Sequence, residues 1–327
     1  MDRPAVAMRA ALLLLSFGMS ISPATAQRAF GQDRIAFTRV REDVRVDGDY
    51  RVEAEIWMMD RDGRNARRLT TNTSDDYGVA WSPDGRTVVL GAVQFEHDSA
   101  GELKPKTAQL YIMSSEGGQP KLISPPGMRA QFPSWSADGR YIAFHGSRGI
   151  GNNTALDVYV VHPDGSGLRQ LTSNAWADTR PDWSPDGTHI AYNSNRSGSS
   201  QIHVMNADGS NDVQLTTGAK GMTNQAPDWS PDGSKIVFVS TRDGDTEIYT
   251  MNADGTDQRR LTNSPTGDDD PEWSGDGSQI VFDRTVAFGQ KKVPQLYIMS
   301  ADGSSQAALT ELPSSSSHAA SSPRRKP

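Results

Sequence analysis

The stretch Trp183-Ser184-Pro185-Asp186-Gly187 decides the fold, because it recurs four more times with at most one change. Seven residues after its Trp, a β-branched apolar residue opens a short apolar strand, as in Ile236-Val237-Phe238. An Asp-Gly pair suits a tight hairpin turn, since Gly tolerates positive φ. Each copy therefore predicts a strand, a tight turn and a second strand. The five copies begin at Trp81, Trp135, Trp183, Trp229 and Trp273.

Two further strands follow in every unit. The third is exemplified by Ile248-Tyr249-Thr250-Met251, which runs into an Ala-Asp-Gly turn, and the fourth ends in Leu261-Thr262. Successive Trp residues are 44 to 54 residues apart. Four short antiparallel strands at this spacing are typical of a propeller blade, whose faces are buried only by stacking on neighbouring blades.

A sixth unit precedes the five complete ones but has no Trp strand of its own. Its three strands are Ile35-Ala36-Phe37, Ile56-Trp57-Met58-Met59 and Arg68-Leu69-Thr70. The sequence therefore predicts an all-β fold over residues 27–312, a six-bladed β-propeller of four-stranded antiparallel blades.

The C-terminal residues 313–327 have two interpretations. They are rich in Ser, Ala and Pro, which is typical of a disordered tail. However, the Leu of a fourth strand precedes the next Trp by twelve residues in three units, and Ser321 stands twelve residues beyond Leu309. This spacing predicts that Ala320-Ser321-Ser322-Pro323 supplies the innermost strand of blade one and closes the ring.

The N-terminus has the chemistry of a signal peptide over residues 1–26. Arg3 and Arg9 give a basic region before a short apolar run from Ala10 to Ile21, and Ala24-Thr25-Ala26 is a small-x-small cleavage site. The rival interpretation is a membrane anchor, for which the apolar run is too short. We expect a periplasmic or secreted protein with no membrane span. The chain has no cysteine, so no disulfide stabilises it.

The charge of the chain is acidic. Its formal net charge is −7, and removing the signal residues (+1) and the last four residues (+3) leaves −7 − 1 − 3 = −11. This balance argues against nucleic acid as a partner. It suits a basic partner or a cation.

The repeats resemble the WD40-like repeats of the TolB-type propeller. The resemblance covers residues 34 to 312 and rests on the Trp-Ser-Pro-Asp-Gly and Asn-Ala-Asp-Gly motifs that begin at Trp183, Asn206, Trp229 and Asn252. It implies a scaffold that binds a protein or peptide in envelope or transport processes. TolB proper carries an α/β domain before its propeller, whereas only a few residues separate Gln27 from Ile35.

The two faces of such a propeller differ in their loops. One face carries the monotonous Asp-Gly turns, and the other carries variable connections, where function tends to lie. Three second-to-third connections are long: Val40 to Ala54, Val93 to Ala108, and Thr285 to Pro294. They belong to blades one, two and six, which are neighbours in a closed ring, so we expect a wall beside the channel. The alternative is neutral insertion, which costs little free energy.

The fourth-to-first connections form a rim around the channel mouth. Asp76, Asp178 and Asp268 each stand seven residues past their Leu, so they are expected at equivalent positions near the axis. An acidic rim would hold a cation such as Ca²⁺ or steer a basic peptide. The alternative is structural pairing of these carboxylates with Arg side chains. The candidate binding residues are Asp75, Asp76, Trp176, Asp178, Arg180, Asn224, Asp268, Asp269, Asp270, Arg148, Arg196 and Arg242.

No catalytic signature is present in the sequence. Thiol chemistry is excluded, the six His are scattered, and no nucleophile elbow or phosphate loop occurs. We therefore expect a monomeric, non-enzymatic scaffold without a cofactor. The alternative is a glycan hydrolase or lyase at the acidic channel mouth. Carboxylates beside exposed aromatic rings would favour the enzyme, and carboxylates paired with Arg would favour the scaffold.

Overall fold

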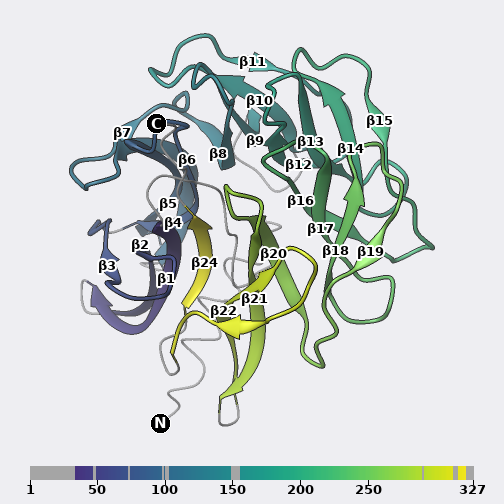
Figure 1. The fold of residues 1–327 in the computed structure, drawn as a ribbon. Helices are drawn as coiled ribbons and strands as arrows, with labels where there is room; N and C mark the ends of the chain where they lie inside the picture. Colours follow the sequence, from purple (N-terminus) through teal and green to yellow (C-terminus); the bar gives the residue numbers. More distant parts are fainter. Residues whose placement is uncertain are drawn as a thin grey trace.

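The computed structural model describes residues 34–46, 49–72, 74–97, 99, 103–148, 155–288, 291–311 and 316–321. These residues form six four-stranded antiparallel sheets, arranged as blades around a central axis (Figure 1). The predicted all-β six-bladed propeller is confirmed. Within the described part of the chain, no helix is long and apolar enough to cross a membrane. The predicted signal peptide lies outside the described residues.

In blades two to six the strands run from the axis outward in chain order. Blade one contains β24 (Ser316–Ser321), β1 (Arg34–Val46), β2 (Asp49–Asp60) and β3 (Arg67–Arg68). Blade two contains β4 (Asp75–Trp81), β5 (Thr87–His97), β6 (Leu103–Ser114) and β7 (Lys121–Leu122). Blade three contains β8 (Met128–Trp135), β9 (Ile142–Arg148), β10 (Asp157–Val161) and β11 (Arg169–Gln170). Blade four contains β12 (Asp178–Trp183), β13 (His189–Ser194), β14 (Gln201–Asn206) and β15 (Val213–Gln214). Blade five contains β16 (Asn224–Trp229), β17 (Lys235–Ser240), β18 (Glu247–Asn252) and β19 (Arg259–Arg260). Blade six contains β20 (Asp268–Trp273), β21 (Gln279–Phe288), β22 (Lys291–Ser300) and β23 (Ala307–Ala308).

The Ser and Asp of the repeated motif hold the first turn of a blade. In blade four, Ser184 Oγ donates to Asp186 Oδ1 at 2.6 Å and accepts the N–H of His189 at 2.9 Å. Gly187 between them has a φ of 72°, which a side chain would disfavour. The motif therefore satisfies the polar groups of its own turn.

The Leu-Thr pair at the end of a blade fixes the third strand and the next blade. Thr216 Oγ1 accepts the N–H of Ile202 at 2.9 Å and donates to Gln201 at 2.9 Å. Leu215 meets the following blade at Gly255, where a Cβ would lie 3.0 Å from the Leu215 carbonyl oxygen. The Gly of the Ala-Asp-Gly turn thus permits the close approach of neighbouring blades.

Each interface between neighbouring blades, called a seam below, buries apolar side chains of both. At the seam between blades four and five, Trp229 packs with Ala191 and Ile202 of blade four and with Ile236 and Phe238 of its own blade. All of these side chains are buried. Burial of such surface is the main favourable contribution to folding of a sheet that cannot cover itself.

The ring closes by backbone pairing between the two ends of the chain. β24 is antiparallel to β1, and Ser321 lies opposite Ile35. In blade five, Trp229 lies opposite Ile236 in the same way. Ser321 therefore takes the register position of the motif Trp, which is the position that the twelve-residue spacing assigns to it.

Side chains of blades six and one also contact each other directly. Arg61 donates to both carboxylate oxygens of Asp276, at 3.0 and 3.3 Å. The hydrogen bond from Arg61 holds the pKa of Asp276 well below its usual range. Gly63 has a φ of 84°, and a Cβ there would lie 2.4 Å from the carbonyl oxygen of Leu309. The approach of Gly63 to Leu309 at this seam corresponds to that of Gly255 to Leu215 at the seam between blades four and five.

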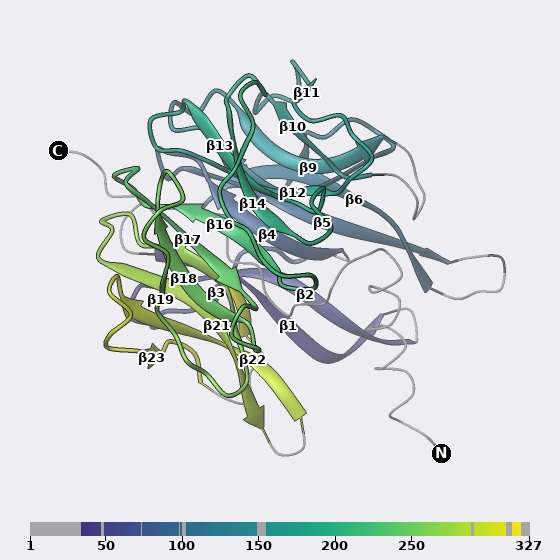
Figure 2. The ribbon, with the colours of Figure 1, turned by 90° about the vertical axis from the view of Figure 1, so that its right-hand side faces the viewer.

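The three long connections are extended hairpins rather than irregular loops. Val40 pairs with Ala54, Val93 with Ala108, and Thr285 with Pro294. The ladders β1–β2, β5–β6 and β21–β22 extend past the body of the propeller on the same side (Figure 2). We call these three hairpins the wall. Apolar and polar residues alternate along Val93-Gln94-Phe95-Glu96 of β5, which a loop assignment overlooks.

We predict that a chain ending at Leu312 is less stable than the full chain, because it lacks β24. A loss of about 2 kcal/mol would lower the melting temperature by roughly 4–8 °C. Thermal melting followed by circular dichroism measures this difference. A chain ending at Ser321 is the control and should melt like the full chain. Equal melting temperatures for the full chain and the chain ending at Leu312 would contradict the role of β24.

Candidate functional site

The rim position five residues before each motif Trp is polar in four blades. It starts the innermost strand in blades four, five and six, and it is the second residue of β4 in blade two. None of these side chains is more than 1% exposed. They therefore form no open acidic funnel, contrary to the expectation from the sequence. The four residues are Asp76, Asp178, Asn224 and Asp268.

Two Arg–Asp pairs form at the rim, and each lies within one blade. Arg284 donates twice to Asp268, with both N···O distances at 2.7 Å. Arg196 lies 3.3 Å from Asp178. Such charge-assisted bonds satisfy carboxylates that would be costly to bury alone. Structural pairing thus accounts for the burial of these two rim residues.

Blade five carries the neutral version of the same pair. Arg242 donates to Asn224 Oδ1 at 2.9 Å, and its guanidinium stacks over Tyr249, 4.6 Å from the ring centroid. In blade three, Arg148 ends β9 and is exposed. A hydrogen bond from Arg148 opposes the burial that raises the pKa of Tyr159. Of the four Arg residues among the candidates, only Arg148 is exposed, whereas Arg180, Arg196 and Arg242 are half-buried.

The rim carboxylates of blade two accept hydrogen bonds from neutral groups. Asp75 Oδ1 accepts the N–H of Ala54 at 3.2 Å, and Asp76 Oδ2 accepts a hydrogen bond from Asn72 at 2.8 Å. Burial raises the pKa of Asp76 to about 7, although hydrogen bonds from Thr70 and Asn72 oppose the shift. Asp76 therefore gains a proton near neutral pH.

Trp176, in the rim loop before β12, is exposed to solvent. Trp176 is 47% exposed, and its backbone N–H donates to Asn174 Oδ1 at 2.8 Å. Asn174 also donates to Asp178 at 2.7 Å, and the next residue, Ala177, donates to Asn195 at 2.8 Å. The loop is thus held by hydrogen bonds on both sides of an exposed indole.

Every innermost strand from blade two to blade six contains a β-bulge at one position. The ladder register shifts there, three residues before the motif Trp. A residue with positive φ stands at each bulge, which is uncommon for non-Gly residues. The five residues are Gly78, Phe132, Arg180, Ala226 and Asp270, with φ between 48° and 54°.

The bulge residues of blades four and six meet across the channel. Arg180 forms an ion pair with Asp270, although blade five separates their two blades. The pair therefore crosses the central channel. Arg180 also stacks over Phe132 of blade three, 4.7 Å from the ring centroid. Three blades are thus joined at the axis by one guanidinium.

His145 positions this crossing residue. Its Nδ1 accepts the backbone N–H of Arg180 at 3.2 Å, and its ring stacks on Phe132 with centroids 5.0 Å apart. Burial, together with the charges of Arg129 and Arg180, holds the pKa of His145 well below its usual value. A neutral His145 is what this accepting role requires.

Asp270 is buried deeply beside this Arg. Burial raises its pKa to about 8; the charge of Asp269 adds to the shift, and Arg180 opposes it. The proton and Arg180 therefore compete for one carboxyl group. Asp270 Oδ2 has no hydrogen-bond partner among the described residues. Asp269 accepts the N–H of Asp270 at 2.9 Å, so it supports the bulge.

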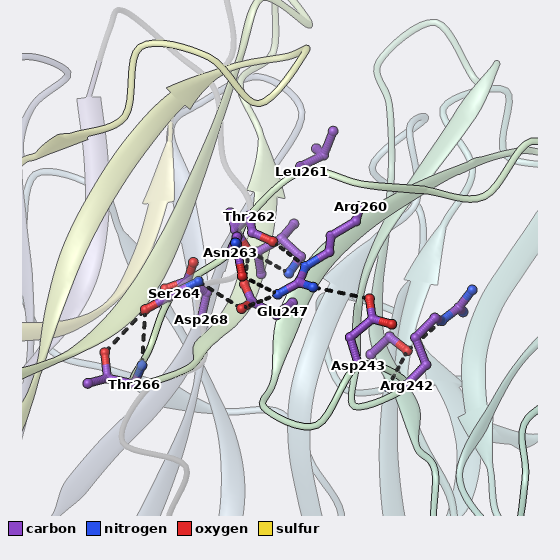
Figure 3. A network of polar contacts seen from close by, with 12 residues as sticks. Arg242, Asp243, Glu247, Arg260, Leu261, Thr262, Asn263, Ser264, Thr266 and Asp268 are labelled. Carbon is purple, nitrogen blue, oxygen red and sulfur yellow. Dashed lines mark hydrogen bonds and ion pairs between the residues drawn. The ribbon is translucent and has the colours of Figure 1, made fainter.

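A second polar network fixes the connection between blades five and six (Figure 3). Glu247 is 1% exposed and accepts hydrogen bonds from Arg260 at 2.7 Å, Thr262 at 2.6 Å and the N–H of Ser264 at 2.7 Å. Arg260 continues to Asp243 at 3.3 Å. These hydrogen bonds hold the rim loop before Asp268 to β18, the third strand of blade five.

Sequence reasoning missed Phe132 and His145, and it named Arg180 and Asp270 without pairing them. The signal was the offset of three residues before the motif Trp, which Phe132, Arg180 and Asp270 share. The residue types at this offset differ in every blade, so no chemical pattern drew attention to it. Among the described residues, no group of three or more His, Asp or Glu is arranged to hold a metal ion.

A family model described as the TolB beta propeller domain matches residues 150–225 and 213–327. Two curated relatives match shorter segments. One is an uncharacterised peptidase, YuxL, of Bacillus subtilis (strain 168), 32% identical over 100 residues, or 31% of this chain and 14% of the relative. The other is an uncharacterised protein, Atu1656, of Agrobacterium fabrum, 30% identical over 124 residues, or 38% of this chain and 37% of the relative. The chain thus spans well under half the length of these relatives.

Solved structures share the fold at low identity. TolB from Acinetobacter baumannii has a TM-score of 0.71 and 22% identity, covering 98% of this chain and 74% of that one. A putative TolB from Agrobacterium tumefaciens has a TM-score of 0.64 and 23% identity, covering 85% and 89%. An oligogalacturonate lyase from Vibrio parahaemolyticus has a TM-score of 0.59 and 16% identity, covering 88% and 77%.

We predict that Asp270→Asn changes the pH dependence of stability. The folded pKa of Asp270, about 8, lies above the usual unfolded value of about 3.9. The folded state therefore holds an extra proton between these values, and wild-type stability falls by up to about 1.4 kcal/mol per pH unit as pH rises through this window. Asn cannot titrate, but its amide oxygen still accepts from Arg180.

Melting temperatures from pH 5 to pH 9 check this prediction. The melting temperature of Asp270→Asn should rise relative to that of the wild type as pH increases. Asp186→Asn is the control, because hydrogen bonds from Ser184 and Thr188 lower the pKa of Asp186, so its removal should bring no such gain. Parallel melting curves for wild type and Asp270→Asn at every pH would refute the assignment.

Proposed function

Because this chain belongs to the TolB β-propeller family, we propose that it is a non-catalytic scaffold that binds a protein or peptide. We place it in the periplasm or outside the cell, as a monomer without a cofactor, in envelope or transport processes. The family match supports the scaffold, and the binding face is argued from the geometry of this chain.

The observation that carries the proposal is the arrangement of one face. Hairpins of three consecutive blades, six, one and two, extend from it as the wall. Trp176 is exposed on the rim of blade four, which stands opposite blade one in a ring of six. An aromatic anchor facing a wall across the channel mouth is the geometry of a partner-binding surface. We therefore propose that the partner lies between the wall and Trp176.

The rim carboxylates favour the scaffold over an enzyme. Asp178, Asp268 and Asp270 are each paired with an Arg, and each is fully or almost fully buried. A glycan hydrolase or lyase needs carboxyl groups that reach a bound sugar. The fold likeness to an oligogalacturonate lyase comes with only 16% identity, so it supports the architecture alone.

The positions of the aspartates change what the acidic net charge implies about a partner. Ten aspartates stabilise the first-to-second and third-to-fourth turns, on the face opposite the rim: Asp62, Asp84, Asp138, Asp164, Asp186, Asp208, Asp232, Asp254, Asp276 and Asp302. The acidic excess therefore gives little reason to expect a basic partner at the channel mouth. We propose recognition by Trp176 and the wall.

We predict that Trp176→Ala weakens partner binding at least about tenfold, because exposed Trp anchors contribute roughly 2 kcal/mol or more at protein interfaces. The immobilised chain is used to capture the partner from periplasmic extract, and its affinity is then measured by calorimetry. Val213→Ala is the matched control, since Val213 is 56% exposed on β15, the outermost strand of blade four. Equal binding by both variants, or cleavage of a glycan by the wild type, would reject the proposal.

A further inference from the structure

The six seams differ in one respect. At five of them the innermost strand of the following blade contributes a Trp, and these are the five motif Trp residues. At the seam between blades six and one, the register position of that Trp belongs to Ser321. The apolar cluster there contains Ile35 and Phe37 of blade one and Val281 and Leu296 of blade six. It contains no tryptophan from an innermost strand.

The motif Trp also takes part in a backbone contact between blades. The N–H of Trp229 donates to Asp182, and the N–H of Trp273 donates to Asp228, at 2.9 and 2.8 Å. In each pair, the carboxylate belongs to the residue just before the Trp of the preceding blade. Glu272 holds this position in blade six. Blade six thus presents an acidic side chain at the place that receives the first strand of blade one.

β24 differs in composition from the other innermost strands. Its residues Ser316–Ser321 read Ser-Ser-His-Ala-Ala-Ser, without a large apolar residue. It is also separated from the rest of blade one by almost the entire chain, since β1 begins at Arg34. It pairs with the backbone of β1 at Ile35, Ala36, Phe37 and Arg39.

We propose that the inner edge of β1 is an exchangeable strand-binding site. β24 occupies it in the free protein, and an extended peptide of a partner protein with a Trp at the Ser321 position replaces β24. The peptide pairs with the backbone of Ile35 to Phe37, which is binding by strand addition. Its indole packs at the seam between blades six and one, as Trp229 packs at the seam before its own blade.

The chain itself defines the chemistry of this peptide. The innermost strands of blades four and five both read Pro-Asp-Trp-Ser-Pro-Asp-Gly from Pro181 and Pro227. A partner segment with the pattern Asp-Trp-Ser-Pro fits the same backbone register. A second copy of this chain is a poorer occupant, because its terminal strand again supplies Ser321.

The exchange lowers the apparent affinity of the peptide. It binds only the fraction of molecules in which β24 has left, so its affinity falls by that fraction. Substitutions that strengthen the pairing of β24 with β1 must therefore weaken binding of the peptide. This inverse relation distinguishes the strand site from a site on the rim or wall, which β24 does not occupy.

The test uses the full chain and a labelled peptide with the sequence of residues 224–233. Fluorescence anisotropy gives its affinity, and a second peptide has Ser in place of the Trp. We expect the Trp peptide to bind at least about tenfold more tightly, since an indole buries far more apolar surface than a hydroxymethyl group. Hydrogen exchange should show the amides of Ser316–Ser321 opening on binding, while those of Ile35 to Phe37 stay protected.

Full-chain variants complete the test. Ser321→Trp should raise the melting temperature and lower the affinity for the peptide at least about tenfold. Val213→Trp, which adds an indole to the exposed outer strand, should leave this affinity unchanged. If Ser321→Trp does not fold, the comparison of the two peptides decides alone. Trp176→Ala should bind the peptide normally, so this result is separate from that of the proposed function. Equal affinity of the two peptides, or binding without opening of β24, would overturn the strand site.

Discussion

A hydrogen bond from the backbone N–H of a motif Trp to the side chain just before the Trp of the preceding blade joins neighbouring blades at the three seams that follow blades three, four and five. It links Trp229 to Asp182 and Trp273 to Asp228. A buried carboxylate that loses such a partner costs about 1–3 kcal/mol or more. Because the same Trp fills the seam, the apolar packing and the polar contact require one geometry. Close Gly contacts, such as that of Gly255 with Leu215, lie between the same neighbouring blades.

Much of the propeller architecture can be predicted from the local sequence. The motif that begins at Trp183 specifies a turn, a register and a seam residue together, so the fold could be predicted blade by blade. The place of Ser321 followed from spacing alone, because backbone pairing needs no particular side chain. The ladders of the wall were missed as strands, since their pairing continues past the point where the repeat ends.

The candidate site was less predictable, because it depends on contacts between blades that the repeat does not relate. Arg180 and Asp270 are 90 residues apart, and only closure of the ring brings them together. Spacing placed Asp178 and Asp268 correctly at equivalent positions. It could not show that Arg196 and Arg284 neutralise them there. A carboxylate identified from the sequence adds negative charge to the surface only where no cation pairs with it.

The wall and the seam without a motif Trp occupy the same part of the ring. The hairpins β21–β22 and β1–β2 belong to the blades on the two sides of that seam, and β5–β6 belongs to the next blade. A partner that holds the wall contacts both sides of the seam at once, and so stabilises the closed ring by its own binding free energy. A peptide that replaces β24 acts on the same seam from the channel side. The two proposed events are therefore thermodynamically linked, and by reciprocity each must alter the affinity of the other by the same factor. In this proposal, β24 is the structural element that couples the wall to the strand site.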